Sequence, residues 1–271
     1  RLRLENRAVC LVEAIEGKDY LGAMASRPIL LTLMTTLHTS HGTLPEDRAE
    51  LYDDAVNLLI DRWQQKSRID LQKKDNSSLA AAQDPRVQKV FQFGTARVRR
   101  VMEGIAFDSH QKQQLQQKED PDAQVKSADI TRTELESAFS KILPDDLNPR
   151  IVVDYLAQHA GLLIPREPGI FIFPHRSFQE FLAACHLLNQ PESTQRLLKL
   201  VDEDLNWWRE VYLLAVGRQK STSLDNAVSL ITALKQDSVN DGQNFSDEDW
   251  HQAALAGEGL LEIRLTLEPE T

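Results

Sequence analysis

Apolar residues recur every three or four positions along most of the chain, and this spacing predicts a mainly α-helical protein. Only 11 glycines and 11 prolines interrupt the pattern, so few strands are expected. The expected helices cover residues 2–15, 28–39, 46–65, 86–107, 131–142, 149–158, 207–216, 224–234 and 247–265, and residues 20–25 lead into the second of them.

One segment departs from the helical spacing. Residues 161–173, GLLIPREPGIFIF, place apolar, partly β-branched or aromatic runs on both sides of Pro168 and Gly169, which predicts a β-hairpin. Two helices precede it, and another begins directly after His175. Helix, helix and hairpin in this order, with further helices around them, are typical of a winged-helix unit.

Single residues predict where several helices begin and end. Pro28 fits a first helical turn, where its missing N–H does no harm. Thr131 and Glu134 have the spacing of a capping box. The acidic runs at residues 145–146 and 202–204 precede helical patterns, so we interpret them as caps and solvated faces and not as metal ligands.

Two polar segments contain few large apolar residues. Residues 67–84 are expected to form a loop or mobile insertion, and residues 108–127 a surface loop or a frayed helix end. The resulting domain prediction is the end of a small helical domain at 1–44, a winged-helix domain with both insertions at 45–188, and a second helical domain at 189–271.

Composition narrows the possible functions. The chain has 271 residues, 41% of them hydrophobic and 27% charged, and no apolar run approaches the roughly 20 residues that cross a bilayer. Its net charge of -10 opposes general attraction to nucleic acid or anionic lipid. The first residues follow a charged helical pattern without an initiator methionine, so we expect a cytoplasmic fragment of a longer protein.

The common catalytic and metal-binding motifs do not occur in the sequence. There is no G-x-x-x-x-G-K-[ST], G-x-S-x-G, H-E-x-x-H or C-x-x-C, so this chain alone is not expected to be an enzyme. His38 and His41 are interpreted as a surface turn. Cys10 and Cys185 have apolar neighbours and are expected to be buried, reduced thiols.

Two alternative functions follow from the residues. A winged helix can bind DNA, but residues 131–158, which would supply the reading helix, carry more acids than bases. A helical scaffold could instead dock partners through Trp207 and Trp208, although such a pair more often has one ring in the core and one at its rim. The basic cluster available to DNA comprises Arg86, Lys89, Arg97, Arg99 and Arg100.

His175 is the main candidate site residue. It follows the hairpin and precedes a helix N-terminus, where the helix dipole favours an anion to which an imidazole can donate. A histidine among apolar residues can equally be a hydrogen-bonded structural residue. The residues alone leave both interpretations open.

Three motifs in sequence order resemble a known family. They are SRPILLTLM at 26–34, LPEDRAELY at 44–52 with LIDRW at 59–63, and FPHRSFQEFLAA at 173–184. Together they look like the region that follows the P-loop core of NACHT-type STAND NTPases, which are NLR-like and here of bacterial type. The resemblance covers residues 2–188 well and the remaining helices more loosely.

This resemblance implies a function and a site. In that family a small helical domain, a winged-helix domain and a second helical domain follow the ATPase core, and bound ADP holds them closed and inactive until exchange for ATP permits assembly. By matching, Pro28 would lie near the adenine and His175 would reach the β-phosphate, with Arg27, Arg176 and Phe178 as weaker matches.

The chain is accordingly expected to be a regulatory arm that controls ATP-dependent oligomerisation in signalling or innate immunity. Its expected partners are the N-terminal P-loop domain of the same parent, other protomers, and effector and sensor modules of unknown kind. ADP and ATP are the cofactors expected in the parent, which would be a P-loop ATPase, and neither is expected to bind tightly to this fragment alone.

Overall fold

The computed structural model describes residues 2–72, 94–120, 128–145, 148–159, 161–234 and 247–263. The chain forms two compact units, residues 1–53 with 187–271 and residues 54–186. The described residues form mainly helices and one small antiparallel sheet, which confirms the predicted fold class. None of the described helices has both the length and the apolar character needed to cross a membrane.

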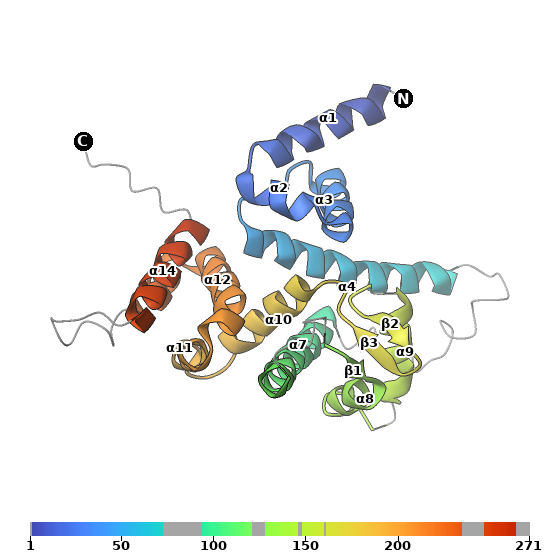
Figure 1. The fold of residues 1–271 in the computed structure, drawn as a ribbon. Coiled ribbons are helices and arrows are strands. Elements are labelled where there is room, and N and C mark those ends of the chain that lie inside the picture. Colours follow the sequence, from blue (N-terminus) through green and yellow to red (C-terminus); the bar gives the residue numbers. More distant parts are fainter. Residues whose placement is uncertain are drawn as a thin grey trace. The chain divides into compact units, whose positions relative to one another are not determined.

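The unit formed by residues 54–186 has the element order of a winged helix (Figure 1). A long helix leads into a short strand, two further helices and a two-stranded hairpin. After the hairpin, α10 (Arg176–Leu188) begins. The elements before it are α7 (Thr95–Glu119), β1 (Ile130–Thr131), α8 (Arg132–Ser140), α9 (Pro149–His159), β2 (Ile164–Glu167) and β3 (Ile170–Ile172).

The sheet has the strand order β1-β3-β2. The predicted hairpin is confirmed, and its turn places Gly169 at a φ of 78°, a left-handed conformation that glycine adopts at no steric cost. Phe171 pairs with Ile130 on one side and with Pro165 on the other, so the three side chains lie on one face of the sheet. The strand β1 was not predicted.

The capping box predicted at the start of α8 is confirmed. The Thr131 hydroxyl accepts from the Glu134 N–H at 3.2 Å, and the Glu134 carboxylate accepts from the Thr131 N–H at 2.6 Å. Burial alone would raise the pKa of Glu134, but hydrogen bonds from Lys112 and Thr131 outweigh burial and lower it. The core of this unit includes the fully buried side chains of Met102, Leu135, Phe139, Phe178, Phe181 and Leu182.

The other unit combines helices from both ends of the chain. Its N-terminal part contains α1 (Leu2–Glu16), α2 (Asp19–Ala25) and α3 (Pro28–His41). Its C-terminal part contains α11 (Ser193–Glu203), α12 (Leu205–Thr222), α13 (Leu224–Ala233) and α14 (Asp247–Glu262). The helix α4 (Arg48–Gln72) begins in this unit and continues into residues of the winged-helix unit.

Helix ends in this unit agree with the sequence predictions. Pro28 is the first residue of α3, and Gly42, at a φ of 82°, ends that helix by donating its N–H to the His38 carbonyl. The Asp204 carboxylate accepts from the Trp207 N–H at 3.1 Å and caps α12, as expected for the acidic run at 202–204. Trp208 is fully buried and Trp207 is 8% exposed, so both rings belong to the core and the expected rim ring is absent.

Three sequence expectations were wrong. Residues 67–72 are helical, since α4 continues to Gln72, whereas the remainder of the expected loop at 67–84 lies outside the described residues. Residues 108–119 are also helical, because α7 buries polar side chains, among them His110 and Gln114, that a count of apolar residues omits. The helix α11 was not predicted at all.

The prediction that Cys10 is buried was wrong. Cys10 is exposed, whereas Cys185 is buried as expected, and both are free thiols. The first part of the helix expected at 86–107 lies outside the described residues, together with Arg86, Lys89 and residues 121–127. The division into domains at 1–44, 45–188 and 189–271 stays a prediction.

Candidate functional site

His175 lies between β3 and α10, and its ring is bonded to the first turn of that helix. The ring nitrogen Nδ1 accepts from the Ser177 backbone N–H at 3.1 Å and lies 2.7 Å from the Ser177 hydroxyl. The His175 carbonyl accepts from the Phe178 N–H at 3.0 Å. His175 therefore caps α10, its Nδ1 taking the place of the side-chain oxygen that normally serves at a helix N-terminus.

This cap determines which ring nitrogen carries the proton. A backbone N–H can only donate, so Nδ1 must present its lone pair to Ser177. In the neutral ring the proton is then on Nε2. The half-buried imidazole thus lies at the N-terminus of a 13-residue helix, where the helix dipole favours an anion such as phosphate.

The weaker candidates beside His175 have defined positions. Arg176 forms an ion pair with Glu180, one turn further along α10, with Nε 2.8 Å from Oε1. Phe178 is fully buried in the core of the unit. Arg176 is thus already paired, and the nucleotide roles of Arg176 and Phe178 stay predictions.

Pro28 and Arg27 belong to the other unit, so the structure places them only among their own neighbours. Both residues are exposed, Arg27 as the residue before α3 and Pro28 as its first residue. The next turn of the same helix exposes Leu31, at 39% of its surface. An exposed proline beside an exposed leucine is compatible with packing against a flat apolar group, and contact with adenine stays a prediction.

Gln179 is a structural residue of α10 that sequence reasoning missed. It is fully buried, accepts from the Ala128 N–H at 3.4 Å and donates to the Gln113 side chain at 3.1 Å. These bonds connect α10 with α7 and with the segment before β1. The available signal was a pair of polar residues, Gln179 and Glu180, between Phe178 and Phe181.

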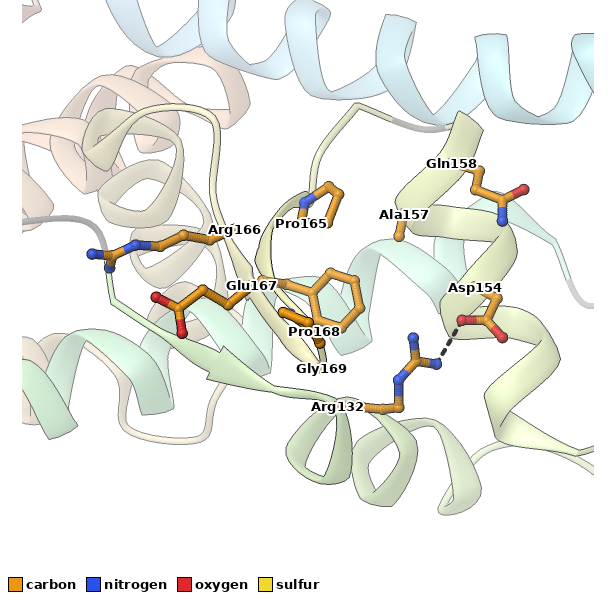
Figure 2. Close-up of a pocket in the computed structure, with 10 residues that line it drawn as sticks. Arg132, Asp154, Ala157, Gln158, Pro165, Arg166, Glu167, Pro168 and Gly169 are labelled. Atoms are coloured by element: carbon orange, nitrogen blue, oxygen red, sulfur yellow. Dashed lines mark hydrogen bonds and ion pairs between the residues drawn. The ribbon is translucent and has the colours of Figure 1, made fainter.

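A groove of about 410 Å³ lies between α8, α9 and the hairpin (Figure 2). Arg132 and Asp154 point toward one another, with Nη1 2.6 Å from Oδ1, while Arg166 and Glu167 extend away from that pair. The Arg132 guanidinium also lies 5.4 Å from the centre of the Phe171 ring. The lining residues are Arg132, Asp154, Ala157, Gln158, Pro165, Arg166, Glu167, Pro168, Gly169 and Phe171.

The arginines around this groove are paired with carboxylates. In DNA-binding helix-turn-helix domains the second helix of the pair enters the major groove, and α9 holds that position here. Arg132 and Arg150 both pair with Asp154, and Arg166 pairs with Asp129 at 2.8 Å. A DNA phosphate would have to compete with these carboxylates.

Arg99, one of the basic residues considered for DNA binding, is also bonded to neighbouring side chains. It donates to Glu103 at 2.9 Å and to Asn57 at 2.6 Å. Among the described residues no group of three or more histidine, cysteine, aspartate or glutamate side chains is arranged to hold a metal ion.

Comparison with known families agrees with this geometry. The family model described as the winged helix-turn-helix domain C-terminal to NACHT matches residues 48–187, just over half of the chain. Comparison with curated proteins and with solved structures gives no match. The matched segment contains α7 to β3, His175 and almost all of α10. The chain therefore belongs to the family of winged helix-turn-helix domains that lie C-terminal to NACHT domains.

Proposed function

We propose that this chain is the regulatory arm of a NACHT signalling ATPase, that it closes over the ADP-bound nucleotide domain, and that it controls ATP-dependent oligomerisation in signalling or defence. The observation that supports this most directly is the position of His175, whose ring caps the start of α10 within the NACHT-associated segment. The proposed cofactors are ADP and ATP, held mainly by the parent's NACHT domain. That domain and other protomers are the proposed partners.

The mechanism requires contacts that exist in one state of the switch and not in the other. A hydrogen bond from His175 to the ADP β-phosphate would be one such contact. Hydrogen bonds to charged groups contribute about 1.5–3 kcal/mol, which changes an equilibrium by roughly 10- to 100-fold. Loss of this bond would therefore favour the open, assembling state. Pro28, exposed at the start of α3, is proposed to contact the adenine.

The test uses two substitutions of His175 in the complete parent protein. His175→Ala removes both the helix cap and the donor. His175→Asp keeps a favourable capping residue but directs a negative charge toward the phosphate, so it separates helix stability from nucleotide binding. We expect both variants to release ADP roughly 10- to 100-fold faster and to assemble without the activating signal.

A matched control is His251→Ala, which removes an exposed imidazole from α14. It should leave ADP release and assembly unchanged. ADP release is followed with a fluorescent ADP analogue, and assembly is followed by light scattering. If both His175 variants retain ADP and assemble no more than the unmodified protein does, the proposed role of His175 is wrong.

A further inference from the structure

We propose that Ser177 is a positioning residue that holds His175 in the Nε2–H tautomer and fixes the direction of that N–H. This inference rests on the proposed function, because it concerns how the phosphate donor is prepared. The two atoms that carry it are the backbone nitrogen and the side-chain oxygen of Ser177, which lie 3.1 Å and 2.7 Å from the same ring nitrogen of His175.

The two Ser177 groups act together on the tautomer. The backbone N–H can only donate, so a proton on Nδ1 would oppose it directly. The hydroxyl can donate as well, and with Nδ1 unprotonated its short contact becomes a second hydrogen bond to the ring. Ser177 is only 8% exposed, so water is poorly able to replace the hydroxyl.

The same contacts restrict the ring's rotation. Turning the imidazole about its bond to Cβ would break both contacts to Ser177, so these contacts hold the ring in one orientation. A donor that is already oriented loses less conformational freedom when its acceptor arrives. Without the hydroxyl, only the backbone N–H would hold the ring.

The first test measures the tautomer itself, with long-range proton–nitrogen correlation spectra of the chain at neutral pH. We expect unprotonated Nδ1 and protonated Nε2 for His175. Ser177→Ala keeps the backbone N–H but loses the hydroxyl, so a detectable fraction of the other tautomer should appear, whereas Ser177→Thr, which keeps the hydroxyl, should retain the original spectrum. Thr194→Ala is the matched control, since it removes a hydroxyl from the same second position of α11.

The second test measures ADP release from the complete parent. Ser177→Ala should release ADP about 2- to 10-fold faster, the effect of losing one hydrogen bond, while Ser177→Thr and Thr194→Ala stay close to the unmodified protein. A protonated Nδ1 in the unmodified chain would overturn the inference. So would a Ser177→Ala variant that keeps both the original tautomer and the original release rate.

The two proposals fail in different ways. If His175→Ala leaves ADP release unchanged, the proposed function fails, but the tautomer spectrum still decides the role of Ser177. If His175→Ala releases ADP faster and His175 nevertheless has a protonated Nδ1, only the Ser177 inference fails. Should Ser177→Ala not fold, the tautomer of His175 in the unmodified chain still tests the inference, because a protonated Nδ1 would overturn it.

Discussion

Glu262 accepts hydrogen bonds from two nitrogens of Arg48, with Nε at 3.1 and 3.2 Å from its two oxygens and Nη2 at 3.0 Å from Oε2. A third nitrogen of the same guanidinium, Nη1, lies 3.1 Å from Glu210. Burial by itself would lower the pKa of Arg48, but these two carboxylates raise it, so the guanidinium remains charged. One arginine thus connects the start of α4 with α12 and α14.

We predict that Glu262→Ala lowers the free energy of unfolding by about 1–3 kcal/mol. Removing one partner of a fully buried pair costs about 3–5 kcal/mol, because the remaining charge is left without compensation. The Arg48 and Glu262 side chains are 23% and 11% exposed and Glu210 stays in place, so we expect less than that full cost. Urea denaturation measures the change.

Glu258→Ala provides the matched control for this prediction. Glu258 lies one turn earlier in α14 and pairs with Arg209 at 2.7 Å, but both of these side chains are more than one-third exposed. Water screens such a pair, so its loss should cost less than about 1 kcal/mol. Equal losses in the two variants would contradict the importance assigned to Arg48 and Glu262.

The pH dependence of stability gives a second prediction. Burial raises the pKa of Glu262 above its ordinary value of 4.5, although Arg48 acts to lower it, and the nearby carboxylates of Asp47 and Glu210 raise it further. The folded chain therefore binds this proton more readily than the unfolded chain does. Protonation of Glu262 therefore stabilises the fold most below pH 4.5, and this stabilisation is lost as pH rises through the raised pKa of Glu262.

Glu262→Gln removes this titration while keeping a side chain of similar size. The unmodified chain should lose stability relative to this variant as pH rises above about 4.5, so its unfolding free energy minus that of the variant should fall. Denaturation curves at several pH values up to neutrality measure it. A difference that grows with pH would mean that the attraction of Arg48 outweighs burial at this site.

Local sequence signals predicted much of the fold. Helical spacing, the Thr131 capping box and the hairpin turn at Gly169 depend on residues close in the chain, and all three are confirmed. The position of His175 between hairpin and helix is confirmed for the same reason. Its bonds to Ser177 were not predicted, because a sequence does not show the orientation of an imidazole ring.

Elements that depend on distant residues were missed. The strand β1 has only two residues and exists through its pairing with β3, about 40 positions later in the chain. The sequence predicts a surface loop or a frayed helix end for the second half of α7 because its residues are mostly polar, among them Gln113, which bonds to Gln179 in α10. For α11 the preceding residue, Glu192, has a left-handed φ of 55° and gives no side-chain cap, so the helix lacks the usual start signal.

The two cysteines should differ strongly in reactivity. Cys10 is exposed on α1, whereas Cys185 is buried in α10, where the Arg99 Nη2 lies 3.8 Å from its sulfur. We predict that a thiol reagent modifies one cysteine rapidly in the folded chain and the second only after unfolding. In Cys10→Ser the rapid phase should disappear. Two rapid phases in the unmodified chain would show that the C-terminal part of α10, which contains Cys185, opens readily.

The charges around α9 predict that this chain does not bind DNA. We expect no measurable affinity for duplex DNA even at about 50 mM salt, since Arg132, Arg150 and Arg166 are paired with Asp129 or Asp154. Fluorescence anisotropy with a labelled duplex measures this directly.

A double variant makes the DNA prediction sharper. Asp129→Asn combined with Asp154→Asn removes the carboxylates but keeps the three arginines, so weak binding that falls with added salt should appear. The neighbouring Glu167→Gln change, which also removes one negative charge from the groove, is the control and should produce far less binding. Strong, salt-dependent binding by the unmodified chain would contradict this prediction, because it would mean that DNA phosphates displace Asp129 and Asp154 from the arginines.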